Sequence, residues 1–169
     1  KRCIEKALEQ SQSDQMVAQA LGMLSDLGKT ELAYEYLQSI GNRVSSSVVL
    51  LHLKGVLAYQ LGYFTQAKQS LREVLIKVPT SGETLHLLST MSDTEEAKEL
   101  QKELDTLLSS MDKAPLSVSK ACFYNALGNT YLKTSEVVTA YQYFEKCAET
   151  MRAISPKDKS FDYSLIEDW

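Results

Sequence analysis

Hydrophobic side chains recur at helical spacing in segments that come in pairs. The clearest segment carries four leucines three or four residues apart: Leu50, Leu53, Leu57 and Leu61. The pattern breaks at Gly62, and a second stripe of the same period runs to Pro79, which cannot continue a helix without losing a backbone hydrogen bond. Residues 48–79 are therefore predicted to form two antiparallel helices. The small residues Gly55 and Ala67 are expected where the two helix backbones approach closely.

A fixed interval relates such helix pairs along the chain. Leu27-Gly28 and Leu61-Gly62 are 61 − 27 = 34 residues apart, and each glycine is followed five residues later by an alanine. Repetition at this period indicates a helix-turn-helix unit, which cannot bury its own apolar face and must stack on further copies. The sequence therefore predicts an all-α fold of stacked antiparallel helix pairs, an α-solenoid.

The repeating unit resembles the tetratricopeptide repeat (TPR). In one unit the resemblance rests on Leu51, Gly55, Ala58, Tyr59, Ala67, Leu71, Val74 and Pro79, and in another on Tyr124, Leu127, Gly128, Tyr131, Ala140, Phe144 and Cys147. The offset from glycine to alanine is the same in both, 67 − 55 = 12 and 140 − 128 = 12. The resemblance implies tetratricopeptide-like helix pairs stacked in a right-handed superhelix. It also implies that ligands are held in a concave groove lined by the first helix of each pair.

The predicted helical repeat domain covers residues 1–156. Its expected parts are the end of a preceding repeat at 1–12 and four repeats at about 14–45, 46–80, 82–114 and 116–156. The third repeat is degenerate, because Ala97 follows Ala67 by only 97 − 67 = 30 residues. This spacing predicts a short first helix, a long second helix and an extended connection over 109–115. Residues 157–169 are predicted to be a C-terminal tail or a truncated capping helix.

Composition narrows the classes of function. The formal net charge is −4 without a cluster of Lys and Arg, which argues against nucleic acid as a partner and against the alternative of an RNA-binding helical repeat. No apolar run is long enough to span a bilayer, so no membrane insertion is expected. Three cysteines without a CxxC spacing are typical of reduced thiols in the cytoplasm, with the nucleus as the alternative. The chain opens without Met on a helical pattern, which suggests a piece of a longer protein.

Catalytic motifs are missing from the sequence, which has no Gly-rich phosphate loop, HExxH or GxSxG. We therefore predict that the chain is not an enzyme and uses no cofactor or metal. The two histidines, His52 and His86, are 86 − 52 = 34 residues apart and so occupy equivalent places on successive first helices. One interpretation is a metal site or a pH-sensing pair, with Cys122 as a third ligand. The favoured interpretation is a pair of polar groove residues that contact a peptide.

The TPR resemblance assigns the lining of the groove to Gln15, Ala18, Gly22, Ser25, Val49, His52, Val56, Tyr59, Glu83, His86, Cys122, Asn125, Asn129 and Leu132. The candidate partner-binding residues among them are Gln15, Val49, His52, Val56, Tyr59, His86, Asn125, Asn129 and Leu132. Ala18, Gly22 and Val56 stand where chaperone carboxylate clamps use Lys, Arg and Asn, so such a clamp is not expected. Asn125 and Asn129, one helical turn apart, could pair with a peptide backbone, and the valines and the tyrosine could receive apolar anchors. The expected partner is a protein that binds through an apolar or mixed peptide or helix.

These expectations favour a non-catalytic protein–protein interaction scaffold, part of a subunit of a larger multi-protein complex. An alternative is a structural subunit that contacts its partners through its ends or its convex face. Residues 160–169 combine three aromatic and three acidic side chains. This segment could dock in the groove as a short linear motif. It could equally be the first helix of a further repeat, with Tyr163 and Ile166 packing on the last helix pair.

Overall fold

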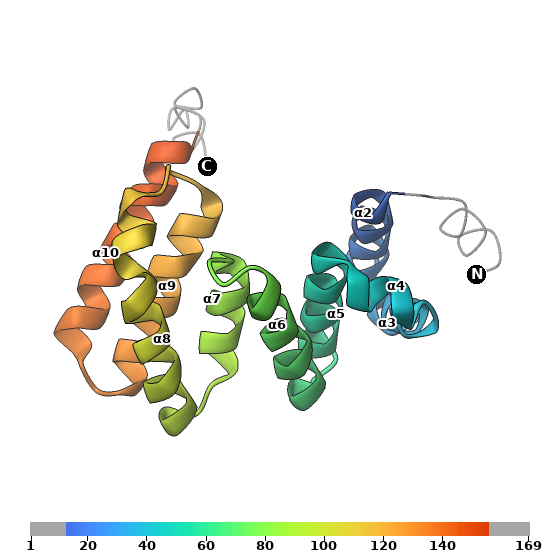
Figure 1. Cartoon of the computed structure of the whole chain (residues 1–169), viewed down its shortest axis with the longest axis horizontal. Coiled ribbons are helices and arrows are strands. Elements are labelled where there is room, and N and C mark those ends of the chain that lie inside the picture. Colours follow the sequence, from blue (N-terminus) through green and yellow to red (C-terminus); the bar gives the residue numbers. More distant parts are fainter. Residues whose placement is uncertain (1–12, 156–169) are drawn as a thin grey trace, which may run out of the picture.

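The computed structural model describes residues 13–155, and within them nine helices are joined by short turns. Their bounds are α2 (Asp14–Asp26), α3 (Thr30–Ser39), α4 (Gly41–Ser46), α5 (Val48–Gln60), α6 (Phe64–Lys77), α7 (Gly82–Met91), α8 (Thr94–Lys113), α9 (Val118–Lys133) and α10 (Val137–Ile154). The pairs α2–α3, α5–α6, α7–α8 and α9–α10 follow one another along the molecule, with the short α4 between the first two (Figure 1). The prediction of an all-α fold of stacked helix pairs is confirmed. The predictions for 1–12 and 157–169 lie outside the described residues.

Three of the turns between paired helices share one local structure. Gly28 and Gly62 have φ angles of 74° and 78°, and Ser135 takes the same place with a φ of 67°. The next residue donates its N–H to the carbonyl five positions earlier, as from Tyr63 to Ala58 at 2.8 Å. This is the Schellman ending of a helix, which needs a residue in the left-handed region. The Leu-Gly pairs that recur in the sequence are therefore the points where first helices end.

Ser135→Gly is expected to raise the free energy of unfolding by about 0.5–1 kcal/mol, because glycine adopts a positive φ without a clash of Cβ against the backbone. Urea denaturation of the full chain measures the change. The matched variant Ser135→Ala keeps the Cβ atom and should give no such gain. Equal stability of the two variants would contradict the strain assigned to the φ of 67° at this position.

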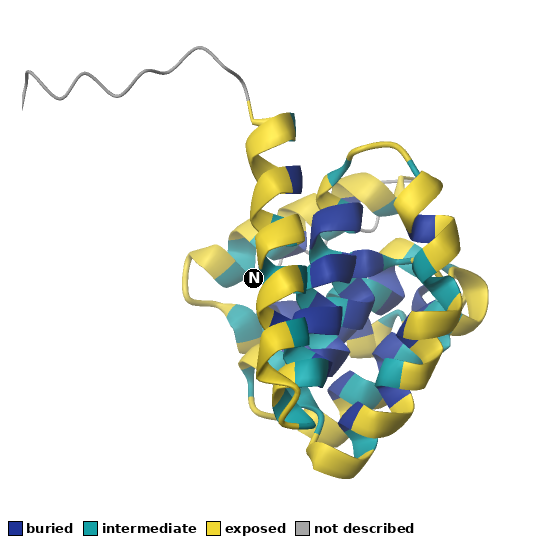
Figure 2. Ribbon diagram, turned by 90° about the vertical axis from the view of Figure 1, so that its left-hand side faces the viewer, coloured by how far each residue is buried: buried dark blue, intermediate teal, exposed yellow. Residues whose placement is uncertain are grey.

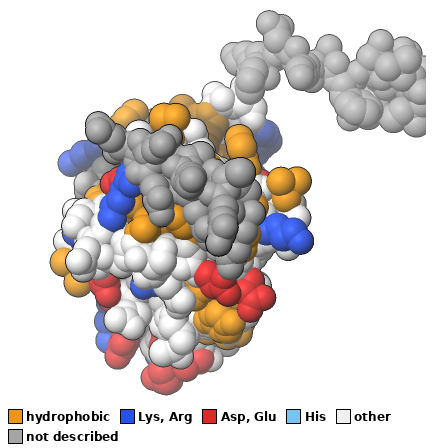
Figure 3. Space-filling view, turned by 90° about the vertical axis from the view of Figure 1, so that its right-hand side faces the viewer, with side chains coloured by type: hydrophobic (Ala, Val, Ile, Leu, Met, Phe, Trp, Pro, Cys, Tyr) orange, Lys and Arg blue, Asp and Glu red, His pale blue; other side chains and the backbone are white. Residues whose placement is uncertain are grey.

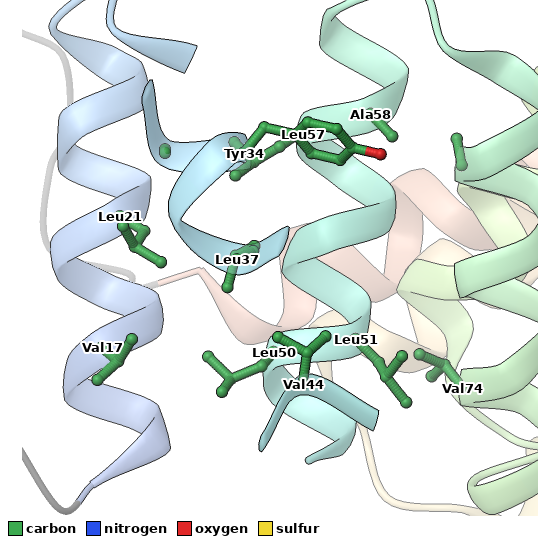
Figure 4. Close-up of a cluster of buried hydrophobic side chains, with 12 residues drawn as sticks. Val17, Leu21, Tyr34, Leu37, Val44, Leu50, Leu51, Leu57, Ala58 and Val74 are labelled. Atoms are coloured by element: carbon green, nitrogen blue, oxygen red, sulfur yellow. The ribbon is translucent and has the colours of Figure 1, made fainter. Parts of the chain in front are cut away.

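Two clusters of apolar side chains fill the space between the helices. In the first cluster, residues of α2, α3, α4 and α5 point toward one another (Figure 4): Val17, Leu21, Tyr34, Leu37, Val44, Leu50 and Leu57. The second cluster is centred on α7, α8 and α9: Leu85, Leu88, Leu100, Leu104, Met111, Phe123, Tyr124 and Leu127. The outward faces of the helices are exposed, and the buried residues lie between them (Figure 2). Because α6 places Ala67 and Val74 in the first cluster and Leu71 in the second, the core is continuous along the stack.

Glycines allow close contact within two of the pairs. A Cβ atom on Gly55 of α5 would lie 2.7 Å from Leu71 Cδ2 and 3.5 Å from the carbonyl oxygen of Ala67, both on α6. A Cβ atom on Gly128 of α9 would lie 2.4 Å from Phe144 Cε1 on α10. The predicted close approach at Gly55 and Ala67 is confirmed, and the pair α9–α10 repeats it.

The third pair has unequal helices, as predicted: α7 has 10 residues and α8 has 20. The extended connection predicted over 109–115 is wrong in its first part, because α8 continues to Lys113. Burial of Met111 extends the apolar stripe of α8 by a further turn. Lys120 of α9 then supplies the partner that the last carbonyls of a helix need, since its Nζ donates to the carbonyl oxygen of Asp112 at 2.8 Å.

The region predicted as the first repeat contains a third helix that the pattern does not indicate. α3 ends at Ser39, and α4 begins at Gly41. The Ser39 hydroxyl donates to the carbonyl oxygen of Tyr36 at 2.7 Å, a local bond of the kind that competes with helix continuation. Val44 anchors α4 in the first cluster, where it is 1% exposed.

Candidate partner-binding groove

The predicted groove residues lie on first helices. Gln15 is in the first turn of α2, and His86 is on α7. The residues on α5 are Val49, His52, Val56 and Tyr59, and those on α9 are Asn125, Asn129 and Leu132. Val49 and Leu132 are 38% and 49% exposed. Gln15 is also exposed, and the others are half-buried. Apolar surface is therefore available on α5 and α9.

The N-terminal ends of α7 and α9 are in backbone contact. The Gly82 N–H donates to Ser119 Oγ at 2.9 Å, and the same hydroxyl donates to Glu83 Oε2 at 2.7 Å. A Cβ atom on Gly82 would lie 1.8 Å from the carbonyl oxygen of Ser119. Only glycine allows this distance between the two helices, and the Glu83 carboxylate already has a partner within the fold.

The C-terminal end of α7 is held by α9 as well. Lys133 Nζ donates to the carbonyl oxygens of Ser89 at 2.7 Å, Thr90 at 3.0 Å and Ser92 at 2.6 Å. These are the carbonyls left without partners where a helix ends, and a cation is favourable there. Asn129 Nδ2 donates to Ser89 Oγ at 3.1 Å. Asn129, predicted to read a peptide, thus joins the two helices.

The contacts of Lys133 and Ser119 are not visible in the sequence. The signal for Lys133 is a lysine in the last turn of a helix, where it would be expected to serve its own helix rather than α7. The signal for Ser119 is weaker, since a serine in a first turn is common. The sequence predicts that the third repeat begins at Gly82. Its contact with α9 could not be predicted, because that contact depends on how the two helices lie relative to each other.

Two neutral histidines occupy the middle of the groove face. Burial lowers the pKa of His52, and the nearby charge of Glu83 partly offsets this. Burial also lowers the pKa of His86, and a hydrogen bond with the Asn125 side chain acts in the opposite direction. His52 Nε2 and His86 Nδ1 are buried and have no hydrogen-bond partner among residues 13–155. Because charging a desolvated imidazole is unfavourable, both side chains are held in the neutral form at neutral pH.

The positions of the side chains do not support the metal interpretation of the two histidines. In the part of the chain from 13 to 155, no three His, Cys, Asp or Glu side chains are placed to hold a metal ion, so His52, His86 and Cys122 do not form such a set. Burial raises the pKa of the Cys122 thiol, and Glu83 and Cys147 raise it further. A raised pKa disfavours the thiolate that binds metals or attacks substrates.

Tyr59 also has a partner within the fold. Its ring centroid lies 6.0 Å from that of Phe64, at the turn between α5 and α6. Truncating Tyr59 or Asn129 would therefore disturb the fold as well as the groove. Val49 and Leu132 are better probes of binding, because their exposed side chains can be changed without opening the core.

Two surface hollows lie outside the predicted groove. One is at the break between α3 and α4, lined by residues 39–43. Another, beside α6 and α8, is lined by Leu75, Pro79, Leu85, Glu103, Thr106 and Leu107. Both are shallow and open, unlike the enclosed sites that bury small molecules.

Apolar side chains also reach the surface at the α2 end of the molecule (Figure 3). There α2 exposes Met16, Met23 and Leu27 by 62%, 66% and 76%. None of the helices within 13–155 is both long enough and apolar enough to cross a bilayer.

Comparison with known proteins supports the resemblance seen in the sequence. Residues 48–75, which cover α5 and most of α6, match the tetratricopeptide repeat family. The crystal structure of MamA has a similar fold, with a TM-score of 0.61 and 16% sequence identity over 90% of this chain and 86% of that chain. No curated protein matches the sequence. TPR folds are in general non-catalytic modules for protein–protein interaction. Residues 48–75 thus match the model of a tetratricopeptide repeat, within an all-α fold of stacked helix pairs that is similar to that of MamA.

Proposed function

We propose that this chain is a non-catalytic scaffold that holds an apolar or mixed peptide or helix of a partner protein on the face formed by α5, α7 and α9. It acts as part of a subunit of a larger complex, in the cytoplasm or alternatively the nucleus. The candidate residues on these three helices line this face, with Val49 and Leu132 as the apolar anchors.

The observation that carries the proposal is the low charge of this face combined with exposed apolar side chains. Among the positions assigned to the groove, Glu83 alone is charged, and its carboxylate accepts a hydrogen bond from Ser119. The nearby Lys133 directs its ammonium group to carbonyls of α7. Because neither charge needs an external partner, the face favours apolar contacts over a charged ligand.

The test is affinity capture from a cytosolic extract with the full chain and two lysine variants, followed by quantitative mass spectrometry. Val49→Lys places a charge on the groove face, whereas Ile76→Lys is the matched control on α6, where Ile76 is 82% exposed. We expect the captured partner to be lost with Val49→Lys and retained with Ile76→Lys, because an apolar ligand cannot cover a charge without a desolvation cost.

Other results of this experiment would place the binding surface outside the groove face. Loss with Ile76→Lys alone would place binding on the second helices, which is one form of the structural-subunit alternative. Retention with both Val49→Lys and Ile76→Lys would contradict the groove and favour the ends of the solenoid as the interface. Circular dichroism of each variant verifies that the fold is intact.

A further inference from the structure

The two histidines of the chain lie on either side of the boundary between the two apolar clusters. His52 is on α5, a helix of the first cluster, and His86 is on α7, a helix of the second. Between them, α6 packs against both helices and contributes to both clusters (Figure 1). The relative position of the two parts of the groove face therefore depends on the packing at this boundary.

One nitrogen of each imidazole is buried without a partner. Neither His52 Nε2 nor His86 Nδ1 is exposed, and no group among residues 13–155 forms a hydrogen bond with either atom. His86 bonds to the Asn125 side chain, so its Nε2 is the nitrogen used for that bond. A neutral imidazole has one nitrogen without a hydrogen, whereas an imidazolium has two N–H donors. In the present positions, the hydrogen of an added proton would therefore have no acceptor.

Glu83 of α7 is the charged side chain that acts on His52 across the boundary. Its attraction raises the pKa of His52, but burial has the larger effect and lowers it. The carboxylate accepts a hydrogen bond from Ser119 Oγ at 2.7 Å, so a contact with α9 already holds it. Glu83 also precedes His86 by one helical turn on α7. From α9, the thiol of Cys122 lies near the same carboxylate, and because its pKa is raised it adds no charge.

Charged side chains of the helices around α5 and α7 do not offset the burial of the two imidazoles. Asp14 of α2 pairs with Arg43 of α4 at 2.7 Å, and Lys54 of α5 lies two residues from His52, on another side of the helix. The other charged groups are paired or exposed: Lys68 and Arg72 pair with Glu96 and Glu103 of α8, Glu73 accepts from Gln69, Lys120 and Lys133 bond to carbonyl oxygens at the ends of α8 and α7, and Asp26, Glu31, Glu35 and Lys77 are exposed. Within residues 13–155, Glu83 is therefore the one charge that favours protonation of the pair.

We propose that His52 and His86 form a pH-sensitive element at the boundary between the two clusters. It holds α5 and α7 in place while both imidazoles are neutral. It loosens in mildly acidic solution, because each added proton places a charge in a buried position that lacks an acceptor. The pH-sensing interpretation of the pair thus applies without a metal. The proposal does not depend on whether a partner binds to the groove face, so the chain alone is used to test it.

The direction of the effect follows from the two states of the chain. An imidazole in the unfolded chain has a pKa of about 6.5. Burial lowers the pKa of both histidines in the folded chain. Between pH 7.5 and 5.5 the unfolded chain therefore takes up protons that the folded chain does not, and the free energy of unfolding falls as the pH falls. The carboxyl groups of Asp14 and Glu96, whose pKa values are also lowered, contribute at more acidic pH, because unfolded carboxyls titrate at about pH 4.

The first experiment is urea denaturation of the full chain at pH 7.5 and 5.5. We expect the equilibrium constant for unfolding to rise by up to about tenfold per histidine, or about 100-fold for the pair. His52→Gln and His86→Gln should each remove one of these factors. Because the chain has two histidines, the double variant has no imidazole, and its stability should not change over this range. An equal fall in the double variant would overturn the proposal.

Hydrogen exchange at pH 5.5 shows where the chain loosens. Residues 48–60 and 82–91, which form α5 and α7, should exchange faster in the unmodified chain than in the double variant. Residues 137–154 of α10 serve as the internal control and should exchange equally in both. Faster exchange of all helices to the same extent would overturn the proposal, because acid would then weaken the fold as a whole and not the boundary.

Nuclear magnetic resonance of the two imidazoles tests the proposal without relying on a folded variant. The Cε1–H signals of the unmodified chain are followed from pH 8 to pH 5, and each single variant assigns one signal. We expect both midpoints to lie below the value of about 6.5 for an unperturbed histidine. A midpoint at or above that value for both side chains would overturn the proposal.

Discussion

Gly82→Ala should lower the free energy of unfolding by about 2–3 kcal/mol or more, although it adds one methyl group. The new Cβ atom would meet backbone on the facing helix, at 1.8 Å from the Ser119 oxygen, 2.7 Å from the Ser119 carbonyl carbon and 3.0 Å from the Phe123 nitrogen. Backbone atoms cannot rotate away as a flexible side chain can. The N-terminal ends of α7 and α9 would have to separate, and the hydrogen bond from Gly82 to Ser119 would be lost. Urea denaturation of the full chain measures the effect.

The matched control is the same substitution at Gly22, inside α2. A Cβ atom there meets nothing within 4 Å. Gly22→Ala is therefore expected to stabilise the chain by about 0.5–1 kcal/mol, because alanine loses less conformational freedom than glycine on entering a helix. If alanine changed the free energy of unfolding in the same direction at Gly22 and at Gly82, the result would contradict the close contact between α7 and α9.

Phe123→Ala is expected to lower the free energy of unfolding by about 3–5 kcal/mol, because a large side chain leaves a cavity in the core. Phe123 is 0% exposed and belongs to the second apolar cluster. Its ring also lies 6.0 Å from that of Tyr124 in an edge-on arrangement, which adds a favourable aromatic contact. Thermal and urea unfolding of the variant measure the loss.

Phe64→Ala provides the control for the loss of a phenyl ring. Phe64 is 53% exposed, and its one aromatic contact within residues 13–155 is with Tyr59. The expected cost is about 1 kcal/mol or less, since little apolar area returns to water. If Phe123→Ala lowered the free energy of unfolding no more than Phe64→Ala does, the result would contradict the role of α9 as the centre of the second cluster.

These contacts also bear on the proposed groove. Hydrogen bonds between side chains of α9 and the backbone of α7 link the two helices, at Gly82 at one end and from Lys133 at the other. They fix the two helices that carry His86 and Asn125. A scaffold that binds a peptide benefits from this rigidity, because the binding face does not have to be ordered when the partner arrives.

The sequence alone determined the helices and most of their ends, because these depend on neighbours along the chain. The period of apolar residues defines a helix face, and glycine or proline ends it within one turn. Helices end at or just before Gly28, Gly62 and Pro79, as their local sequence predicts. The repeat could therefore be recognised from the sequence. The turn at Ser135 has the same geometry without the glycine, so the sequence signal is weaker there although the backbone is the same.

Tertiary structure alone decided which of the predicted groove residues are exposed and which have partners within the fold. Asn129 contacts Ser89, and Lys133 contacts the end of α7, across separations of 40 and 44 residues in the chain. A periodic pattern places a side chain on one face of its helix, but it does not give the distance to the neighbouring helix or the hydrogen-bonding groups found there. Those depend on how closely α7 and α9 pack, which Gly82 permits and the apolar core enforces. For this reason the sequence could only predict the groove residues, and the packing of the helices separated those that hold α7 and α9 together from those that are exposed.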